Sequence, residues 1–243
     1  MHSHQSCATL KASAKEHMFG RYGSAIGAYL IVTFLTGFAT LSVTSLTGNT
    51  VSLFGICIHY ALLFAVSVFT GLLSSGSAYF YLKIVTGHPA AVSDVFYGFH
   101  MDPEKAISIQ AWITLLAFLG SLPEYIVLYR MPVRPDASAL TQYGLCMILS
   151  GVVALVLDLF YAPAFFLMHD FPQYSARELL AMSRKLMAGN KGRLFYLYLS
   201  YLPLLLLGIL SCGIALLWVF PYLNAALAEF YMDVITHSKA SDH

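Results

Sequence analysis

The fold is decided by residues 176–193, which read ARELLAMSRKLMAGNKGR, and residues 194–231, which read LFYLYLSYLPLLLLGILSCGIALLWVFPYLNAALAEFY. The first segment is basic and amphipathic, and the second carries no charge before Glu229. One continuous helix over residues 194–230 would be about 55 Å long, whereas the hydrocarbon core of a bilayer is about 30 Å thick. We therefore expect the chain to turn back, and Ser211-Cys212-Gly213 is the best turn.

This turn creates a hairpin of two short spans, Arg193–Leu210 and Gly213 to about Val234. A helix needs about 20 residues to cross a bilayer. The alternative is therefore a hairpin that enters the membrane without crossing it completely. In that case protein must shield the non-helical backbone at its tip.

The composition of the whole chain is that of a membrane protein. Hydrophobic residues make up 58% of the 243 residues and charged residues only 10%, with a mean hydropathy of +0.71. A soluble domain could not cover so much apolar surface with polar groups. The first apolar run, residues 25–46, is too long for a secretory signal and is expected to remain as an anchor. We interpret residues 1–243 as one membrane domain.

Further charge-free segments at residues 22–82, 106–123 and 137–157 predict four more spans. The predicted fold class is thus all-α, a polytopic transmembrane bundle of about six spans in three hairpins. A tight turn at residues 47–50 joins the first two spans, and Pro163 bends the fourth because it lacks a backbone donor. These four spans are Ala25–Leu46, Val51–Lys83, Ala106–Tyr129 and Tyr143–Met168.

A short helix on the cytoplasmic surface is predicted before each hairpin. The first covers residues 10–19 and ends at Gly20. Before the last hairpin, Ser175 and Glu178 form a capping box, in which each side chain accepts a hydrogen bond from the backbone of the other residue. This amphipathic helix lies either in the plane of the membrane interface or against the bundle.

The beginning of the chain resembles its end. A shift of 169 positions aligns two copies of a basic helix, a Gly-x-x-Gly motif and a span. A weaker third copy covers residues 93–109, where Gly98 is expected to end a short helix. The predicted repeat units are residues 10–83, 88–170 and 171–235, followed by a polar tail at residues 236–243. The aligned pairs are Met18 with Met187, Gly20 with Gly189, Gly23 with Gly192, and Tyr29 with Tyr198.

The positive charges predict an orientation in the membrane. With six spans, Arg130 and Arg134 lie outside, and all other Lys and Arg residues lie in the cytoplasm. This distribution matches the positive-inside bias and places both termini in the cytoplasm. With five spans the C-terminus, including Lys239, would lie outside.

Three patterns in the C-terminal third resemble a known family. They are S-R-x-L-M-x-G-N-x-x-R-L-F at residues 183–195, L-G-I-L-x-x-G-I-x-L-L-W-V at residues 207–219, and P-Y-x-N-A-A-x-A-x-F-Y at residues 221–231. The similarity covers most of the chain, except residues 131–144. The chain resembles the bacterial integral membrane family catalogued as domain of unknown function 975. The resemblance implies a multi-pass protein of the bacterial cytoplasmic (inner) membrane, and it implies no reaction, cofactor or catalytic residue.

Asp158 is the acidic residue that lies well inside a predicted span. A charge there costs about 2.5–3.5 kcal/mol on insertion scales, so such residues face the bundle and often mark a pathway. The alternative is a protonated or hydrogen-bonded carboxyl that only joins two helices. Small or polar residues share its side of the helix, namely Ser150, Gly151, Ala154, Tyr161 and Ala162.

Tyr161 and three residues in other spans complete the intramembrane polar candidates. Asn224 shares a face of the last span with Ala228 and is expected to pack against a neighbouring helix. Glu229 is expected to be a solvated carboxylate near the cytoplasmic end, and His59 is expected to form a hydrogen bond with a neighbour.

Basic residues near the last surface helix are candidates for contact with anionic lipid headgroups. Each would contribute about 1 kcal/mol to such binding. The positive-inside bias is the simpler explanation of the same charges. These residues are Arg184, Lys185, Lys191 and Arg193.

The sequence lacks the usual enzyme signatures. It contains no H-E-x-x-H motif, no G-x-S-x-G motif and no C-x-x-C pair among its four cysteines. His88 and Asp94 are one residue further apart than in H-x4-D acyltransferases. We predict no metal, no cofactor and no nucleic-acid partner, and we leave a protein partner or a homo-oligomer open.

Three classes of function remain. The favoured one is a non-enzymatic protein that binds or moves a lipid or small amphiphile, or that serves as a membrane subunit. The second is a proton- or substrate-coupled transporter that uses Asp158. The third is an intramembrane enzyme in which Asp158, or the pair His88 and Asp94, acts as acid or base.

Overall fold

The computed structural model describes residues 5–48, 52–132 and 136–241. In these ranges the chain forms nine α-helices and one 3-10 helix, without a β-strand. The predicted turn at residues 47–50, Arg134 and the side chain of Lys239 lie at least partly outside the described residues. The elements are α1 (Cys7–Met18), α2 (Tyr22–Thr47), α3 (Leu53–Val85), η1 (Val92–Phe99), α4 (Pro103–Arg130), α5 (Ala137–Tyr161), α6 (Ala164–Asp170), α7 (Ala176–Leu186), α8 (Lys191–Leu210) and α9 (Leu216–Ser241).

Five segments of the described chain are long and apolar enough to span a membrane. The chain is therefore a multi-pass membrane protein. α9, which contains the sixth predicted span, is not among the five, because Asn224, Glu229 and Asp233 lower its hydropathy. The five segments are Tyr22–Thr47, Phe54–Val85, Pro103–Arg130, Ala137–Asp170 and Lys191–Leu210.

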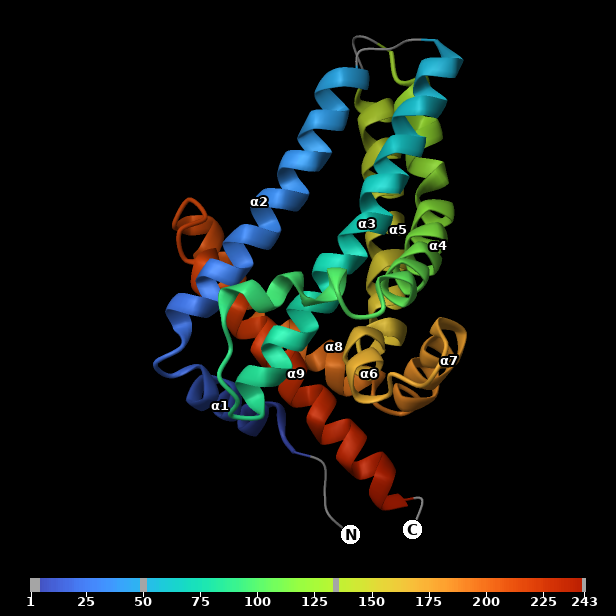
Figure 1. Ribbon diagram of the computed structural model, residues 1–243. Helices are drawn as coiled ribbons and strands as arrows, with labels where there is room; N and C mark the ends of the chain where they lie inside the picture. Colours follow the sequence, from blue (N-terminus) through green and yellow to red (C-terminus); the bar gives the residue numbers. More distant parts are fainter. Residues whose placement is uncertain (1–4, 49–51, 133–135, 242–243) are drawn as a thin grey trace.

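The hairpin of α8 and α9 turns where the sequence predicts. α8 ends at Leu210, and Cys212 and Gly213 have φ angles of +52° and +89°. Glycine adopts such left-handed angles without a steric penalty. In Figure 1 this turn, coloured orange to red, lies at mid-height, below the upper ends of α2 and α3. The hairpin therefore extends through less of the molecule than α2 and α3 do.

The predicted helix signals before the first and last hairpins are confirmed. Gly20 follows α1 and Gly189 follows α7, with φ angles of +76° and +86°. The capping box is present, because the backbone N–H of Ser175 donates to Glu178 Oε2 at 2.8 Å. α7 also buries three apolar side chains against the bundle, so this face of the helix is covered by protein. They are Leu179, Leu180 and Leu186.

The segment before α4 differs from the predicted surface helix. η1 is a 3-10 helix that packs on α3, and Gly98 lies within it instead of ending it. A Cβ atom on Gly98 would lie 2.2 Å from the Leu72 carbonyl oxygen, and one on Gly76 would lie 1.8 Å from the Val95 carbonyl oxygen. Gly98 is thus needed for close contact between backbones. The chain reverses at Asp102, which has a φ angle of +48°.

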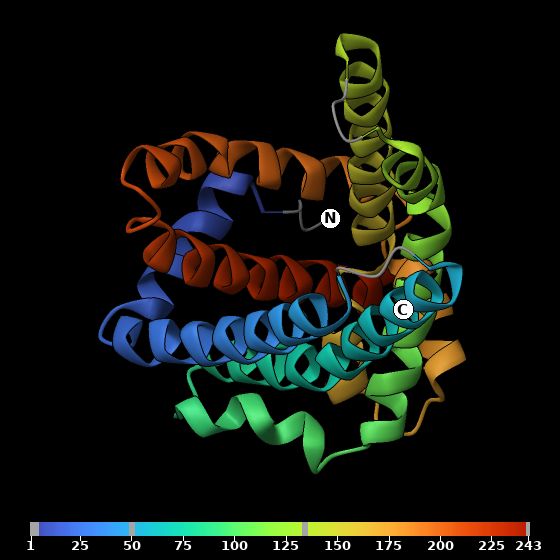
Figure 2. The ribbon, with the colours of Figure 1, turned by 90° about the horizontal axis from the view of Figure 1, so that it is seen from above.

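The helices form two regions. In Figure 1, α2, α3, α4 and α5 extend upward, while α1, α6, α7 and the C-terminal end of α9 gather at the lower end. Figure 2 shows α5 beside α4 and away from α2. The most deeply buried side chains come from this lower region and from the end of α3 and the start of α8, for example Leu10, Phe80, Leu167, Leu194 and Tyr231. The upper helices expose large apolar side chains, as expected for faces in contact with lipid; examples are Phe34, Phe38, Leu41, Leu145 and Ile148.

Candidate functional site

A cavity of about 530 Å³ lies between α2, α3, α4, α5, α8 and α9. Much of its wall is apolar, including Val32, Ile113, Leu157 and Leu227. Three of the predicted polar residues, Asp158, Tyr161 and Asn224, line it. The remaining polar lining residues are Tyr29, Thr33, Ser74, Ser77, Tyr81, Gln110 and Tyr198. We call this space the central cavity.

Asp158 lines the central cavity from the last turn of α5. α5 ends at Tyr161, and Pro163, which has no backbone N–H, separates it from α6. The change of direction places Phe165 and Phe166 in the same wall. The predicted inward face of α5 is also the face that lines the cavity, with Ala154, Asp158, Tyr161 and Ala162.

Asp158 has a partner from α8. The Tyr198 hydroxyl donates a hydrogen bond to the Asp158 carboxylate. A hydrogen bond to a charged group contributes about 1.5–3 kcal/mol, whereas a charge inside a span costs about 2.5–3.5 kcal/mol. At the midpoints of these two ranges, one hydrogen bond leaves part of the cost of an ionised carboxylate uncompensated. No Lys or Arg lines the described wall of the cavity, so a bound cation would stabilise the carboxylate further.

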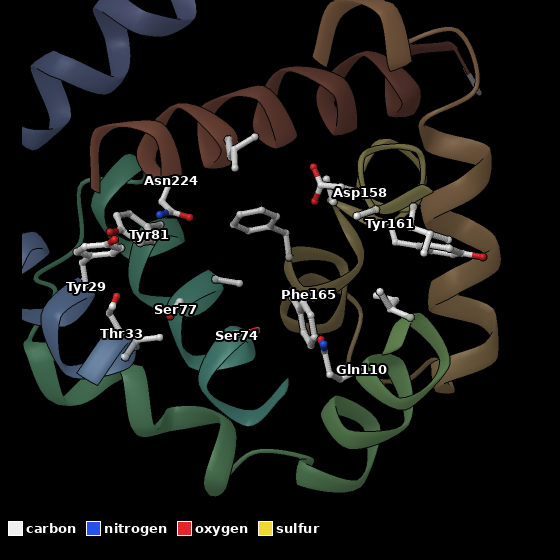
Figure 3. Close-up of a pocket in the computed structure, with 18 of the residues that line it drawn as sticks. Tyr29, Thr33, Ser74, Ser77, Tyr81, Gln110, Asp158, Tyr161, Phe165 and Asn224 are labelled. Atoms are coloured by element: carbon white, nitrogen blue, oxygen red, sulfur yellow. The ribbon is translucent and has the colours of Figure 1, made fainter. Parts of the chain in front are cut away.

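The opposite end of the central cavity carries a different group of polar side chains. Figure 3 shows Tyr29, Tyr81 and Asn224 together there, away from Asp158. Tyr81 is only 4% exposed, and its hydroxyl has no hydrogen-bond partner among the described residues. The amide nitrogen of Asn224 donates to the Phe220 carbonyl at 2.9 Å. A buried polar atom without a partner costs about 1–3 kcal/mol, and the Tyr81 hydroxyl oxygen is enclosed by protein at this end of the cavity.

Trp112 lies directly behind the Asp158 end of the central cavity. Its Nε1 donates to the Tyr161 hydroxyl at 3.4 Å, which links α4 to α5. Tyr161 lines the cavity on its other side. Trp112 is therefore linked to the Asp158 end of the cavity through Tyr161, while 45% of its own surface is exposed.

The structure does not bring Glu229 or His59 to the central cavity. The expectation of a solvated carboxylate at Glu229 is wrong, because the residue is buried and pairs with His17 of α1 at 2.5 Å. Nδ1 of His59 lies 2.6 Å from the Thr47 hydroxyl, so its predicted hydrogen bond to a neighbour is confirmed. These two contacts join helices and do not meet at one site.

The four basic candidates for headgroup contact separate into two pairs. Arg193 donates to the buried carboxylate of Asp233 at 2.6 Å, and the Lys191 ammonium lies 3.5 Å from the centre of the Phe160 ring. These two side chains are held by the protein. Arg184 and Lys185 are exposed on α7.

The pair His88 and Asp94 is also separated by its contacts. Asp94 pairs with Lys83 at 2.7 Å, whereas Nδ1 of His88 lies 2.9 Å from the Thr86 hydroxyl. Among the described residues, no group of three or more His, Cys, Asp or Glu side chains is placed to hold a metal ion.

Sequence reasoning missed several residues of the central cavity, above all Tyr81, Gln110 and Tyr198. A signal existed for Tyr198, because the predicted repeat pairs it with Tyr29, and both side chains line the cavity. Tyr81 and Gln110 have no such signal, because an apolar span contains nothing that singles out a tyrosine or glutamine facing inward.

The comparisons with known proteins identify a family but not an activity. No curated protein and no solved structure matches the chain. A family model does match, and it covers residues 1–238, which is nearly the whole sequence. The chain belongs to the family described as "Protein of unknown function (DUF975)".

Proposed function

We propose that the protein binds a small amphiphile with a cationic group in the central cavity, in a bacterial cytoplasmic membrane and without catalysing a reaction. The observation that carries the proposal is the carboxylate of Asp158 in a largely apolar cavity whose described wall has no Lys or Arg. Aromatic rings beside a carboxylate favour a cation through both its charge and the ring quadrupole. Tyr198 bonds to Asp158, and three further rings of the cavity wall follow Asp158 closely in the sequence, namely Tyr161, Phe165 and Phe166.

The two ends of the cavity define the class of ligand more closely. An amine or quaternary ammonium group would lie beside Asp158, and a hydrogen-bonding oxygen would lie near Tyr29 and Asn224. The apolar wall between them suits a hydrocarbon body. The volume of about 530 Å³ falls in the range of sites for small molecules.

The proposed arrangement in the membrane has six embedded helices, α2 to α5, α8 and α9, in three hairpins with both termini in the cytoplasm. The distribution of Lys and Arg supports this orientation. α1 and the C-terminal end of α9 lie at the same end of the molecule, which is consistent with it (Figure 1). The mid-height turn of the last hairpin favours partial entry of α8 and α9 into the membrane. Arg184 and Lys185 on α7 would then contact anionic headgroups.

Quenching of Trp112 tests the binding proposal. Trp218 is the second of the two tryptophans, so Trp218→Phe leaves Trp112 as the single reporter. The protein in dodecyl maltoside micelles would be titrated with dodecyltrimethylammonium that carries bromine atoms, which quench a nearby tryptophan at short range. We expect saturable quenching. Asp158→Asn should weaken the apparent affinity of this binding at least tenfold.

Two controls separate binding from partition into the micelle. Asp136→Asn removes a carboxylate from the other end of α5, and Asn caps a helix as well as Asp does. It should leave the titration unchanged, and brominated dodecyl sulfate should give no saturable quenching. Equal titrations for Asp158→Asn and Asp136→Asn would overturn the proposal. A saturable response to brominated phosphatidylethanolamine would identify a membrane lipid, instead of a free amphiphile, as the source of the amine.

A further inference from the structure

A second cavity, of about 410 Å³, lies between α3, α4 and α5, on the side of the central cavity toward the upper ends of these helices. Its acidic residue is Glu124, close to the end of α4. Among the described residues Glu124 has no ion pair, and no Lys or Arg lines the wall. Hydroxyl groups of Ser67, Thr114, Ser121 and Ser150 belong to the same wall.

Aromatic rings line the second cavity together with Glu124, as they line the central cavity together with Asp158. The rings of Tyr60 and Tyr125 have their centres 4.5 Å apart, and Phe118 contacts both. All three rings line the second cavity. The two cavities thus share one chemistry, in which a single carboxylate lies among aromatic rings and hydroxyl groups without a basic residue.

The two cavities meet at small side chains. Ala117 of α4 and Ala154 of α5 line both of them. Trp112 of α4 contacts Tyr161 of α5, so the Asp158 end of α5 is level with Trp112. α4 and α5 run in opposite directions, because Gly120 packs on Val153 as Trp112 does on Tyr161. Asp158, three residues before Tyr161, is therefore level with about Leu115 of α4. Glu124 lies nine residues further along α4, which corresponds to about 14 Å. The two carboxylates are thus separated by slightly less than half of a bilayer core of about 30 Å.

We propose that Glu124 forms a second site for the same cationic group, and that the two cavities in series conduct an organic cation between the two sides of the membrane. This inference rests on the proposed function of Asp158 and extends it from binding to movement. The cation would pass along the inner faces of α4 and α5, where Gly151, Ala117 and Ala154 leave room for it.

Uptake of radiolabelled tetraethylammonium into phosphatidylglycerol liposomes that contain the protein tests the inference. The wild-type protein should give uptake above that of empty liposomes. Glu124→Gln should reduce this uptake at least tenfold while leaving the quenching of Trp112 unchanged, because the first site is intact. The inference would be overturned if wild-type uptake equalled that of empty liposomes. It would also be overturned if Glu124→Gln and the wild type gave equal uptake. An unaltered quenching titration in Asp158→Asn would instead overturn the proposed function, so the two failures are distinguishable.

A steric block gives a second test that does not change charge. Gly151 lines the second cavity, and a Cβ atom there would have no neighbour within 4 Å. Gly151→Leu should therefore fill the cavity without a backbone clash and reduce uptake at least fivefold. Gly144→Leu is the matched control, because Gly144 lies on the same helix in equally open space and outside both cavities. Equal uptake by the two variants would contradict a path through the second cavity.

Discussion

Tyr198 of α8 donates a hydrogen bond from its hydroxyl group to the carboxylate of Asp158 on α5. This contact attaches the last hairpin to the fourth predicted span, and it lies in the wall of the central cavity. The same bond could be purely structural, because a carboxyl that joins two helices needs no ligand. The two interpretations differ in what happens when each partner is changed alone.

Tyr198→Phe removes the bond and leaves the carboxylate. We expect the free energy of unfolding to fall by about 1.5–3 kcal/mol, because a hydrogen bond to a charged group is lost. Binding of dodecyltrimethylammonium should persist, because Asp158 still supplies the charge. Thermal unfolding in micelles and the quenching of Trp112 measure the two effects. Tyr196→Phe is the control, since Tyr196 is exposed on the same helix. If Tyr198→Phe lost binding and Tyr196→Phe did not, the role given to Asp158 would be contradicted.

Gly76→Ala should destabilise the packing of η1 on α3. The new Cβ atom would lie 1.8 Å from the Val95 carbonyl oxygen, so the backbone must move. We expect a loss of about 1–3 kcal/mol in the free energy of unfolding, as for other overpacked sites. Gly37→Ala in α2 has no neighbour within 4 Å and should be neutral or slightly stabilising, because Ala favours helix. Equal melting temperatures for the two variants would contradict the described contact.

Arg193→Gln should destabilise the protein far more than Arg184→Gln. Asp233 is 1% exposed in its side chain and pairs with Arg193. We expect the free energy of unfolding to fall by about 3 kcal/mol. This value is at the lower end of the range for a broken buried ion pair, because Asp233 keeps a hydrogen bond from the Gln5 backbone. Arg184 is exposed, so its replacement should change stability by less than about 0.5 kcal/mol.

Lipid retention should show the opposite order for these basic residues. The double variant Arg184→Gln, Lys185→Gln should retain about thirtyfold less phosphatidylglycerol. Each of the two charges contributes about 1 kcal/mol to the binding of an anionic headgroup. Native mass spectrometry measures the retained lipid. Arg130→Gln, at the other end of the molecule, is the control. A reduction by Arg130→Gln as large as that of the double variant would contradict a headgroup site on α7.

Glu178 predicts a pH dependence at the start of α7. Hydrogen bonds from the backbone N–H and the hydroxyl of Ser175 lower the pKa of the Glu178 carboxyl below its ordinary value of 4.5. Because the pKa is lower in the folded state, the stabilisation is present above pH 4.5 and is lost as the pH falls through the folded-state pKa. Hydrogen exchange of the α7 amides should therefore accelerate in acid beyond its intrinsic pH dependence. Glu178→Gln keeps the acceptor oxygen but should remove this extra acceleration. Acceleration that persists in Glu178→Gln would contradict the assignment of the pH dependence to Glu178.

Local signals in the sequence predicted the parts of the fold that depend on neighbouring residues. The turn at Cys212 and Gly213, the stops at Gly20 and Gly189, and the capping box each follow from a few adjacent residues. The inward face of α5 also followed from helical spacing, because small residues recur around Asp158.

Contacts between distant segments were not predictable in this way. η1 needs Gly76 and Gly98 to meet α3, and nothing near Gly98 indicates that partner. Glu229 seemed solvated because its partner, His17, lies in α1 at the other end of the sequence.

The candidate site was predicted only in part for the same reason. Asp158 is visible in the sequence as an acid within an apolar run. Its partner Tyr198, and the Tyr81 hydroxyl across the cavity, become evident only when the helices are assembled. Glu124 was missed because it lies near the end of its span, where a carboxylate is ordinarily solvated.

The most direct test of the account is the titration of Trp218→Phe protein with brominated dodecyltrimethylammonium, with and without Asp158→Asn. The account predicts saturable quenching of Trp112 that Asp158→Asn weakens at least tenfold and Asp136→Asn leaves unchanged. The account would be contradicted if the quenching did not saturate, or if Asp158→Asn left the titration unchanged. Either result would show that the Asp158 carboxylate does not hold a cation.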